Sequence, residues 1–316
     1  MRDEAPYLAE ALASISEQTL EDFETIVVDD GSTDESAEIA VAHARHDPRF
    51  RVVRQPARGV VAALERARAE ARGRFVARMD GDDVALPQRL ALQLEALESE
   101  GLDACGGRIS YFGAVRDGAR RYESWVNSLV TAEAAARDVF VECPIPHPTL
   151  VARREAVSYR DCGWPEDYDL VLRLWASGGR FRNVEHVVLR WREHAGRASR
   201  TEGAYSQASF VRCKVHHLRA ALVSDRVVVW GAGPVGKSFA RELRRQGSEV
   251  VAFVEVDPRK IGREIYGTPV VSVDDAARFA DAFAVGAVSG EEARTRIREM
   301  VAVQGRREGV DFVAVA

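Results

Sequence analysis

The stretch RFVARMDGDDVALPQRL, residues 74–90, decides how the first part of the chain folds. A short apolar run ends in three carboxylates, Asp80, Asp82 and Asp83, and Pro87 then opens a leucine-rich helical pattern. Carboxylates this close together repel one another and cost stability unless a positive group lies among them. A hard divalent cation such as Mg²⁺ or Mn²⁺ suits the cluster, because it takes oxygen ligands from one or two carboxylates and fills its shell with substrate phosphates. The alternative is an acidic loop that caps the following helix.

The segments around this stretch alternate between strand and helix patterns. Strands are predicted over ETIVVDD (24–30), FRVVRQP (50–56) and RFVARMD (74–80), and amphipathic helices over residues 33–46 and 59–72. This alternation is typical of a parallel α/β sheet. Both acidic clusters, DDGSTD and DGDD, then fall where strands end. Ligands of open α/β sheets bind outside the carboxyl ends of the strands, so we expect both clusters on one rim with a shared ligand.

Length and composition predict two globular domains. The chain has 316 residues and 46% hydrophobic content, and we expect domains over residues 1–223 and 224–316. No apolar stretch approaches the roughly 20 residues of a membrane span, and the first residues lack the features of a signal peptide, so a cytoplasmic protein is expected. Peripheral membrane contact stays open. A formal charge of -5 argues against nucleic acid as a partner.

A fresh strand-glycine-helix-strand unit begins with RVVVWGAGPVG, residues 226–236. Gly231, Gly233 and Gly236 let a backbone approach a phosphate at a helix N-terminus, and Glu255 follows where a ribose-binding acid would lie. We therefore expect a nucleotide or NAD(P) site in a small sheet of about five strands. About 90 residues are too few for a complete dehydrogenase with its substrate domain.

Three motifs give the first domain a family resemblance. VVDDGSTDES (27–36), ARMDGDDVALPQRL (77–90) and WPEDYDLVLRLWASG (164–178) occur in the order and spacing of family 2 glycosyltransferases. The resemblance covers about residues 1–220. It implies an inverting enzyme with a GT-A fold, followed here by a small Rossmann-like α/β domain. It also implies a UDP- or GDP-sugar donor, Mn²⁺ or Mg²⁺, and a saccharide or lipid-linked acceptor hydroxyl, as in the synthesis of bacterial polysaccharides or glycoconjugates.

By this resemblance the first two motifs bind the donor. Asp29 and Asp30 contact the nucleotide, and Asp30 accepts a hydrogen bond from the base. Asp80 lies near the ribose and diphosphate and shares the metal with Asp82, which is expected to be the direct ligand. Asp83 is expected to support the loop. The alternative for Asp30 is a cap of the following helix, and the two roles are compatible.

The third motif supplies a base by the same resemblance. In-line displacement at the anomeric carbon needs a carboxylate that takes the proton of the acceptor hydroxyl. Asp167 fits this base, and Glu166 fits a supporting or sugar-contacting role. The alternative is a helix start, where acidic residues in the first turn favour the positive end of the helix dipole. Geometry alone allows both roles.

The segment LRWREHAGRASR, residues 189–200, resembles the flexible arginine- and histidine-bearing segment that follows the acceptor helix in this family. Arg192, His194 and Arg197 are therefore candidates for contacts with the diphosphate or the metal, which together neutralise the leaving group. Arg192 is expected on the nucleotide-sugar and His194 on the metal. The alternative is that each is a solvated surface residue.

The start of the chain departs from the family pattern. Members normally begin with a buried strand that lines the nucleotide base, followed by an Asn-Glu pair. This chain opens at the equivalent of that pair, as MRDEAPYL (1–8), so we expect the first strand to be absent. Its loss would leave neighbouring strands with unpaired backbone groups and remove much of the base pocket. A misassigned start is the favoured explanation, and an impaired chain or a substitute segment are the alternatives.

The second domain resembles the small Rossmann-like domains at the front of bacterial sugar-modifying acetyltransferases and polysaccharide-epimerase proteins. Such a domain binds a nucleotide or docks the enzyme to a partner, and both roles stay open. The competing function is an NAD(P)- or nucleotide-binding oxidoreductase or sensor with a catalytically impaired first domain. The three motifs favour a glycosyltransferase of the hexosyltransferase type, because a sensing module needs no D-x-D motif together with a base.

Overall fold

The computed structural model describes residues 1–197 and 203–316, which form two compact units. The first unit contains Met1–Ala136, Pro144–Cys162 and the chain from Glu166 to residue 197; the second contains Arg137–Cys143, Gly163–Pro165 and Gly203–Ala316. Residues 198–200 of the segment expected to meet the diphosphate lie outside the described residues. Helix α9 (Gln207–Ala221) belongs to the second unit, and the boundary at residues 223/224 stays a prediction.

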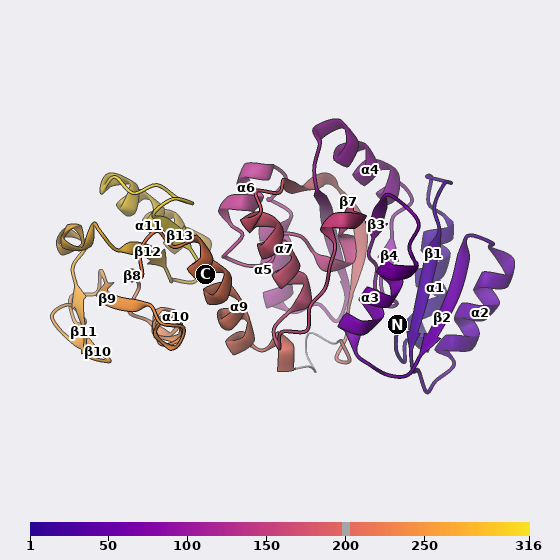
Figure 1. The fold of residues 1–316 in the computed structure, drawn as a ribbon, viewed down its shortest axis with the longest axis horizontal. Coiled ribbons are helices and arrows are strands. Elements are labelled where there is room, and N and C mark those ends of the chain that lie inside the picture. Colours follow the sequence, from indigo (N-terminus) through magenta and orange to yellow (C-terminus); the bar gives the residue numbers. More distant parts are fainter. Residues whose placement is uncertain (198–202) are drawn as a thin grey trace. The chain divides into compact units, whose positions relative to one another are not determined.

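The sheet of the first unit is mixed. Its strands are β1 (Thr25–Asp30), β2 (Phe50–Gln55), β3 (Phe75–Ala77), β4 (Val84–Ala85), β5 (Ala104–Gly113), β6 (Val151–Arg153) and β7 (Phe181–Glu193) (Figure 1). β1 and β2 form a parallel pair, as their sequences predict. The other strands follow the order β3-β6-β5-β7-β4, where only β5 and β7 run parallel. The expectation of a parallel sheet therefore holds for part of this unit.

Helices cover these strands, and the sequence pattern predicts those within residues 33–46 and 59–72 and the one that follows Pro87. The helices are α1 (Ala5–Ser16), α2 (Ser36–His46), α3 (Val60–Glu70), α4 (Arg89–Glu100), α5 (Asp117–Val126), α6 (Ala132–Arg137) and α7 (Glu166–Ala176). α1 begins with Pro6 in its first turn, where a missing N–H costs nothing. α4 ends at Gly101, whose φ of +65° suits a residue without a Cβ.

Among the described residues of this unit, two apolar clusters join helices to strands. Leu8 and Leu12 of α1 pack with Val27 of β1 and Phe50 of β2. A second cluster joins α4 to β5 and β7 and contains, among others, Leu97, Leu102, Ile109, Val188 and Leu189. Burial of each such side chain contributes about 1.5–3 kcal/mol relative to exposure. The acidic turn after β3 thus lies between two packed blocks.

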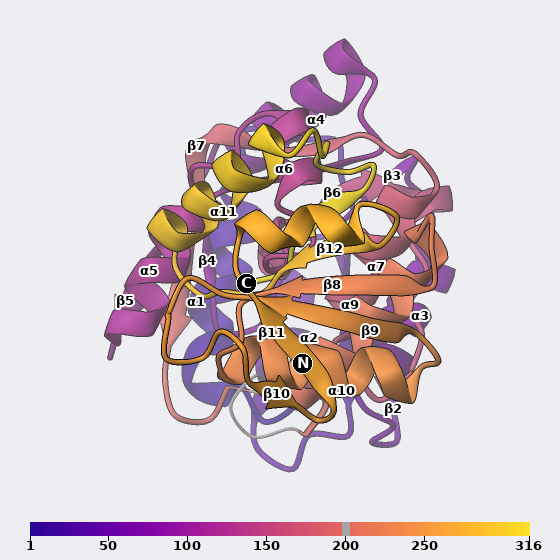
Figure 2. The ribbon, with the colours of Figure 1, turned by 90° about the vertical axis from the view of Figure 1, so that its left-hand side faces the viewer.

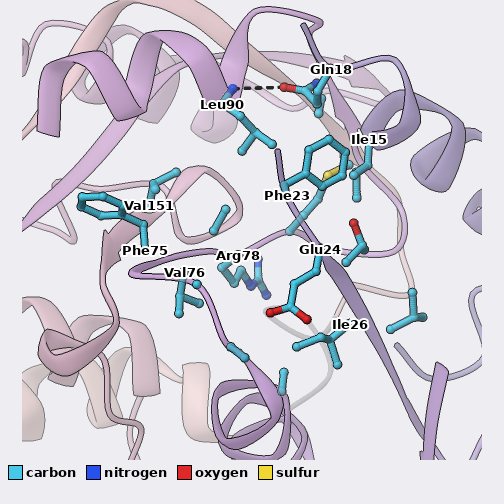
Figure 3. Close-up of a pocket in the computed structure, with 18 of the residues that line it drawn as sticks. Ile15, Gln18, Phe23, Glu24, Ile26, Phe75, Val76, Arg78, Leu90 and Val151 are labelled. Atoms are coloured by element: carbon cyan, nitrogen blue, oxygen red, sulfur yellow. Dashed lines mark hydrogen bonds between the residues drawn. The ribbon is translucent and has the colours of Figure 1, made fainter. Parts of the chain in front are cut away.

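A cavity of about 790 Å³ separates β1 from β3. β1 pairs with β2 and β3 pairs with β6, and residues of both strands line the cavity, among them Ile26 and Val76 (Figure 3). Met1 lies at one end, where its ammonium donates to the Val28 carbonyl (2.8 Å) and its carbonyl accepts from the Asp30 N–H (3.0 Å). These two bonds are those of a residue paired in parallel with β1. The sheet of the first unit is therefore interrupted at this cavity.

The second unit is a separate, mostly parallel sheet of Rossmann type. Its strands are β8 (Arg226–Trp230), β9 (Glu249–Val254), β10 (Glu264–Ile265), β11 (Thr268–Val271), β12 (Phe283–Gly286) and β13 (Phe312–Ala314), in the order β10-β11-β9-β8-β12-β13. α10 (Pro234–Arg245) packs against β8 and β9, and α11 (Glu291–Val303) against β12 and β13 (Figure 2). The two-residue β10 brings the sheet to one strand more than the sequence predicts.

Candidate active site

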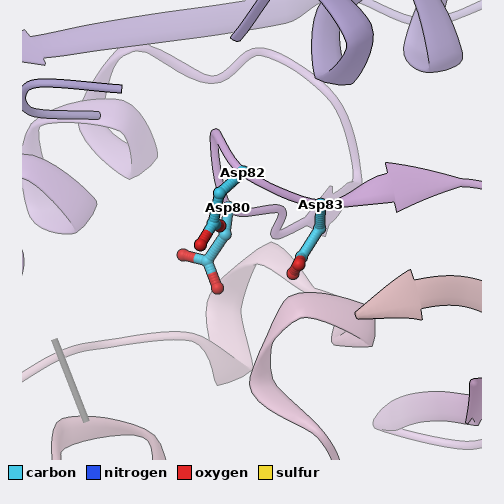
Figure 4. A group of neighbouring side chains, drawn as sticks. All are labelled: Asp80, Asp82 and Asp83. Atoms are coloured by element: carbon cyan, nitrogen blue, oxygen red, sulfur yellow. The ribbon is translucent and has the colours of Figure 1, made fainter. Parts of the chain in front are cut away.

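The three carboxylates of the DGDD stretch lie together in the turn between β3 and β4. Ligand oxygens of Asp80, Asp82 and Asp83 all lie within 4.8 Å of one another (Figure 4). Asp82 is 8% exposed and Asp83 is fully buried. Burial, and after it the charge of Asp80, raises the pKa of both Asp82 and Asp83. A cation placed among these oxygens would reduce the repulsion between the carboxylates, which contributes to the raised pKa values.

Each member of the triad already has a partner of its own. Arg78 Nη1 donates to Asp80 Oδ2 at 2.5 Å, and His194 Nε2 lies 2.8 Å from Asp82 Oδ2. Asp83 Oδ1 accepts the backbone N–H of Arg192 at 2.8 Å, which fits the expected role of Asp83 in supporting the loop. Arg78 is therefore one positive side chain of the protein that lies against the triad.

Arg192 lies near the end of β7 and contacts the turn that carries the triad. Its Nε donates to the Asp82 carbonyl at 2.7 Å, and its guanidinium pairs with Glu10 of α1. The guanidinium carbon also lies 4.7 Å from the ring centre of Tyr7 and 4.3 Å from that of Phe112. These contacts fix Arg192 beside the triad, and its contact with a nucleotide-sugar stays a prediction.

The other acidic pair, Asp29 and Asp30, ends β1. Asp30 Oδ1 accepts from Gln55 Nε2 at 2.7 Å, and its Oδ2 accepts from the Gly59 N–H at 2.8 Å. Burial raises the pKa of Asp30, but these hydrogen bonds outweigh it and the pKa ends below its ordinary value. α2 begins only at Ser36, so the cap role considered for Asp30 is wrong. Asp30 instead holds the loop between β2 and α3.

The expected base lies in the first turn of α7. Asp167 is half-buried, whereas Glu166 is 2% exposed. Glu166 Oε1 lies 3.7 Å from His147 Nδ1, and His147 Nε2 lies 3.0 Å from the Tyr159 hydroxyl. Burial, with the charge of Arg78, lowers the pKa of His147 well below its ordinary value, so the imidazole is neutral. His147 thus acts as a buried support for Glu166.

Glu4 is a site residue that sequence reasoning missed. Burial, and after it Asp82 and Asp80, raises the pKa of Glu4 to about 7. A Cβ added to Gly81 would lie 3.3 Å from Glu4 Cγ, so Glu4 packs against the acidic turn. Nothing in the spacing of the sequence links Glu4 to residues almost eighty positions later. Only the packing of α1 against the turn brings them together.

Arg197 is the third candidate of its segment. Its guanidinium carbon lies 4.6 Å from the ring centre of Trp191, and its Nη1 lies 3.5 Å from Glu193 Oε2. Asp80 and Asp83 are close enough for their charges to raise the pKa of Arg197, although burial opposes this rise. A cation is thus present near the triad, and its contact with a diphosphate stays a prediction.

The glycine loop of the second unit meets Glu255. Gly231 has a φ of +113°, and a Cβ on Gly236 would lie 1.9 Å from the Gly231 carbonyl oxygen, so the loop requires glycine. The Ala232 N–H donates to Glu255 Oε2 at 3.2 Å, and Lys260 Nζ donates to the same oxygen at 2.9 Å. Gly233 precedes α10 directly. The predicted glycines and the predicted acid are therefore neighbours, with the acid bonded to the loop.

The fold and the acidic turn define a glycosyltransferase of the GT-A fold joined to a Rossmann-like domain. Residues 1–160 match glycosyl transferase family 2, and the chain belongs to this family. Residues 224–307 match the CoA binding domain. Both parts of the predicted fold class are confirmed.

Individual relatives agree with this assignment. The putative glycosyltransferase EpsE of Bacillus subtilis is 30% identical over 211 residues, which are 63% of this chain and 73% of the relative. Two other relatives match over shorter stretches, and the chain spans 29% and 22% of their lengths.

Two solved structures show the same fold at low identity. TarS of S. aureus in complex with UDP-GlcNAc is 16% identical with a TM-score of 0.56, over 78% of this chain and 70% of that chain. The mannosyltransferase PcManGT from Pyrobaculum calidifontis, in complex with GDP-Man and Mn²⁺, is 17% identical with a TM-score of 0.53, over 98% of this chain and 79% of that chain. Among the described residues, no helix is both long enough and apolar enough to span a membrane.

Proposed function

We propose that this chain transfers a hexose from a UDP- or GDP-sugar to an acceptor hydroxyl, with inversion at the anomeric carbon. The observation that carries the proposal is the triad of Asp80, Asp82 and Asp83, whose ligand oxygens lie within 4.8 Å of one another and of which Asp82 and Asp83 are buried. Two relatives of the same fold support it, since TarS is solved with UDP-GlcNAc and PcManGT with GDP-Man and Mn²⁺. We further propose that the reaction takes place in the cytoplasm and serves bacterial polysaccharide or glycoconjugate synthesis.

The donor would bind along the rim formed by the ends of β1 and β3. Asp29 and Asp30 would hold the nucleoside, while Asp80, Asp82 and His194 would hold Mn²⁺ or Mg²⁺. Oxygen-rich ligand sets of this kind suit these hard cations. When bound, the cation supplies positive charge to the departing nucleoside diphosphate. Arg192 and Arg197 would add charge from the protein side.

The acceptor would bind on the side of α7. Asp167 would take the proton of the attacking hydroxyl, because a single in-line displacement needs a base opposite the leaving group. Glu166 would orient this turn through its contact with His147, which lies 3.7 Å away. The acceptor class that we propose is a saccharide or lipid-linked saccharide. Contact with a membrane surface would then be peripheral.

The second unit would bind a nucleotide at its glycine loop. The match to the CoA binding domain and the closeness of Gly231, Gly233 and Gly236 to Glu255 support this role. NAD(P) is the alternative ligand, and docking to a partner is the alternative role. Because the transfer residues lie in the first unit, we expect the second unit to be dispensable for the chemistry.

The test is release of nucleoside diphosphate from a panel of UDP- and GDP-sugars, with Mn²⁺, with Mg²⁺ and with EDTA. We expect one donor to be turned over in a metal-dependent way. A parallel assay follows nicotinamide absorbance with NAD⁺ and NADP⁺, which the competing oxidoreductase function requires. Nicotinamide turnover without any nucleoside diphosphate release would contradict the proposal.

A further inference from the structure

Arg78 is a cation inside the acidic turn whose role neither the motifs nor the comparisons assign. Its side chain is 12% exposed, and its Nη1 donates to Asp80 Oδ2 at 2.5 Å. Its backbone is fixed on both sides: the N–H donates to the Leu150 carbonyl at 2.8 Å, and the carbonyl accepts from Arg89 Nη2 at 2.6 Å. The guanidinium is thus held next to a carboxylate that we expect to bind a metal.

Arg78 is charged at every pH at which the protein is folded, because an arginine guanidinium is not deprotonated in proteins. Its charge lies directly against the Asp80 carboxylate. A permanent positive charge beside Asp80 repels a second cation that approaches the same oxygens. Arg89 adds a further buried guanidinium behind the turn, where its charge is close enough to be felt by Arg78.

We propose that Arg78 is the resident counter-ion of Asp80 and sets how tightly the triad binds a divalent cation. The inference rests on the proposed metal-binding role of the triad. Arg78 occupies Asp80 Oδ2, so a divalent cation that binds this oxygen must displace Arg78, and one that binds Oδ1 lies beside the charge of Arg78. Arg78 is therefore a positioning residue, and it touches neither sugar nor acceptor.

One consequence concerns the nucleotide. A nucleoside diphosphate carries negative charge into the site and offsets the repulsion between Arg78 and the incoming cation. Binding of the cation and binding of the diphosphate then strengthen each other by the same factor. The site takes up its metal together with its donor, and little metal binds alone.

The experiment measures Mn²⁺ binding by the loss of the free-ion signal in electron paramagnetic resonance. The full-length chain is titrated alone, with UDP and with GDP, for the wild type and for Arg78→Met and Arg78→Lys. Arg74→Met is the matched control, because Arg74 is 80% exposed and pairs with Glu98 outside the triad. Circular dichroism of each variant confirms that it is folded.

We expect UDP or GDP to tighten Mn²⁺ binding by about tenfold or more in the wild type. Arg78→Met should bind Mn²⁺ alone about tenfold more tightly than the wild type, with a smaller effect of nucleotide. Arg78→Lys and Arg74→Met should resemble the wild type. A purely structural role of Arg78 predicts the opposite sign, since a damaged turn binds Mn²⁺ more weakly.

If folded Arg78→Met binds Mn²⁺ as tightly as the wild type or more weakly, the inference about Arg78 is wrong, while the proposed metal site is not contradicted. If Arg78→Met does not fold, the wild type decides: tight Mn²⁺ binding without any effect of UDP or GDP overturns the inference. Absence of Mn²⁺ binding in every arm would overturn the proposed metal site itself, and the inference with it.

Discussion

Asp169 and Asp167 lie two positions apart in the PEDYDL motif. We predict that substitution of Asp169 lowers stability, whereas substitution of Asp167 lowers sugar transfer. Asp169 is fully buried. Its carboxylate accepts from Arg160 Nε and Nη2, at 3.0 and 2.8 Å, and from Arg173 Nε at 2.8 Å. Asp169→Ala removes the shared partner of two guanidinium groups, so the loss is structural.

The size of this loss follows from burial. Removal of one partner of a buried ion pair typically costs about 3–5 kcal/mol. The side chains of Arg160 and Arg173 are 45% and 24% exposed, so water recovers part of this cost and about 2–4 kcal/mol remains. In a unit of about 200 residues each kcal/mol lowers Tm by about 2–4 °C, which predicts a fall of about 4–16 °C.

The assay is thermal unfolding followed by circular dichroism, at more than one scan rate, for the wild type, Asp169→Ala and Asp167→Asn. Asp167→Asn is the matched control on the same helix, since Asp167 is half-buried and its substitution keeps the shape of the side chain. We expect the control to melt within about 2 °C of the wild type. A folded Asp169→Ala that melts as the wild type does would refute the reasoning, because the ion pairs would then contribute nothing.

Four further results are expected. Asp167→Asn should lower sugar transfer by about 10²-fold or more while donor binding survives, and steady-state kinetics with calorimetry would separate the two; undiminished transfer would place the base elsewhere. Asp82→Asn should remove Mn²⁺-dependent nucleotide binding, and unchanged sensitivity to EDTA would contradict the assigned ligand. The free energy of unfolding should fall by about 1–2 kcal/mol as pH rises from 4.5 through about 7, because the folded state retains a proton on Glu4 that the unfolded state releases. Urea titrations in EDTA at about pH 5 and about pH 8 should show this fall. The variant Glu4→Gln should show a smaller fall. Gly236→Ala should destabilise the second unit by about 2 kcal/mol or more, because the new Cβ would lie 1.9 Å from the Gly231 carbonyl oxygen. If the variant melts as the wild type does, the loop can move away from the new Cβ and the prediction is wrong.

The sequence predicts the local elements of this chain well because their patterns are short-ranged. Periodicity predicts β1 and β2, and the alternation of strand and helix patterns predicts their parallel pairing; the helix start considered at the PEDYDL motif is α7. The third predicted strand, residues 74–80, is shorter in the structure and ends at Ala77. The Arg78 N–H still donates to the Leu150 carbonyl at 2.8 Å, and beyond it the chain leaves the ladder and Asp80 lies in the acidic turn.

The parts that could not be predicted depend on contacts between distant segments. Glu4 meets Asp82 only because α1 packs against the acidic turn, and His147 meets Glu166 only across the fold. Arg78 stood in the stretch that decides the fold, yet the sequence alone does not say that its side chain pairs with Asp80. For the same reason the cap role of Asp30 was wrong, since its true partners come from the next strand and loop.

The cavity between β1 and β3 has a mechanical consequence. A continuous ladder of backbone hydrogen bonds would tie Asp30 rigidly to Asp80, but here the two blocks are joined through the end of α1 and the residues that follow it. Gln18 Nε2 donates to the Leu86 carbonyl at 2.8 Å, and the Leu90 N–H donates to Gln18 Oε1 at 3.0 Å. Side-chain contacts of this kind yield more easily than a ladder does. If Asp30 and Asp80 bind the two ends of one donor, as proposed, the distance between them is therefore set by these contacts and not by a strand ladder.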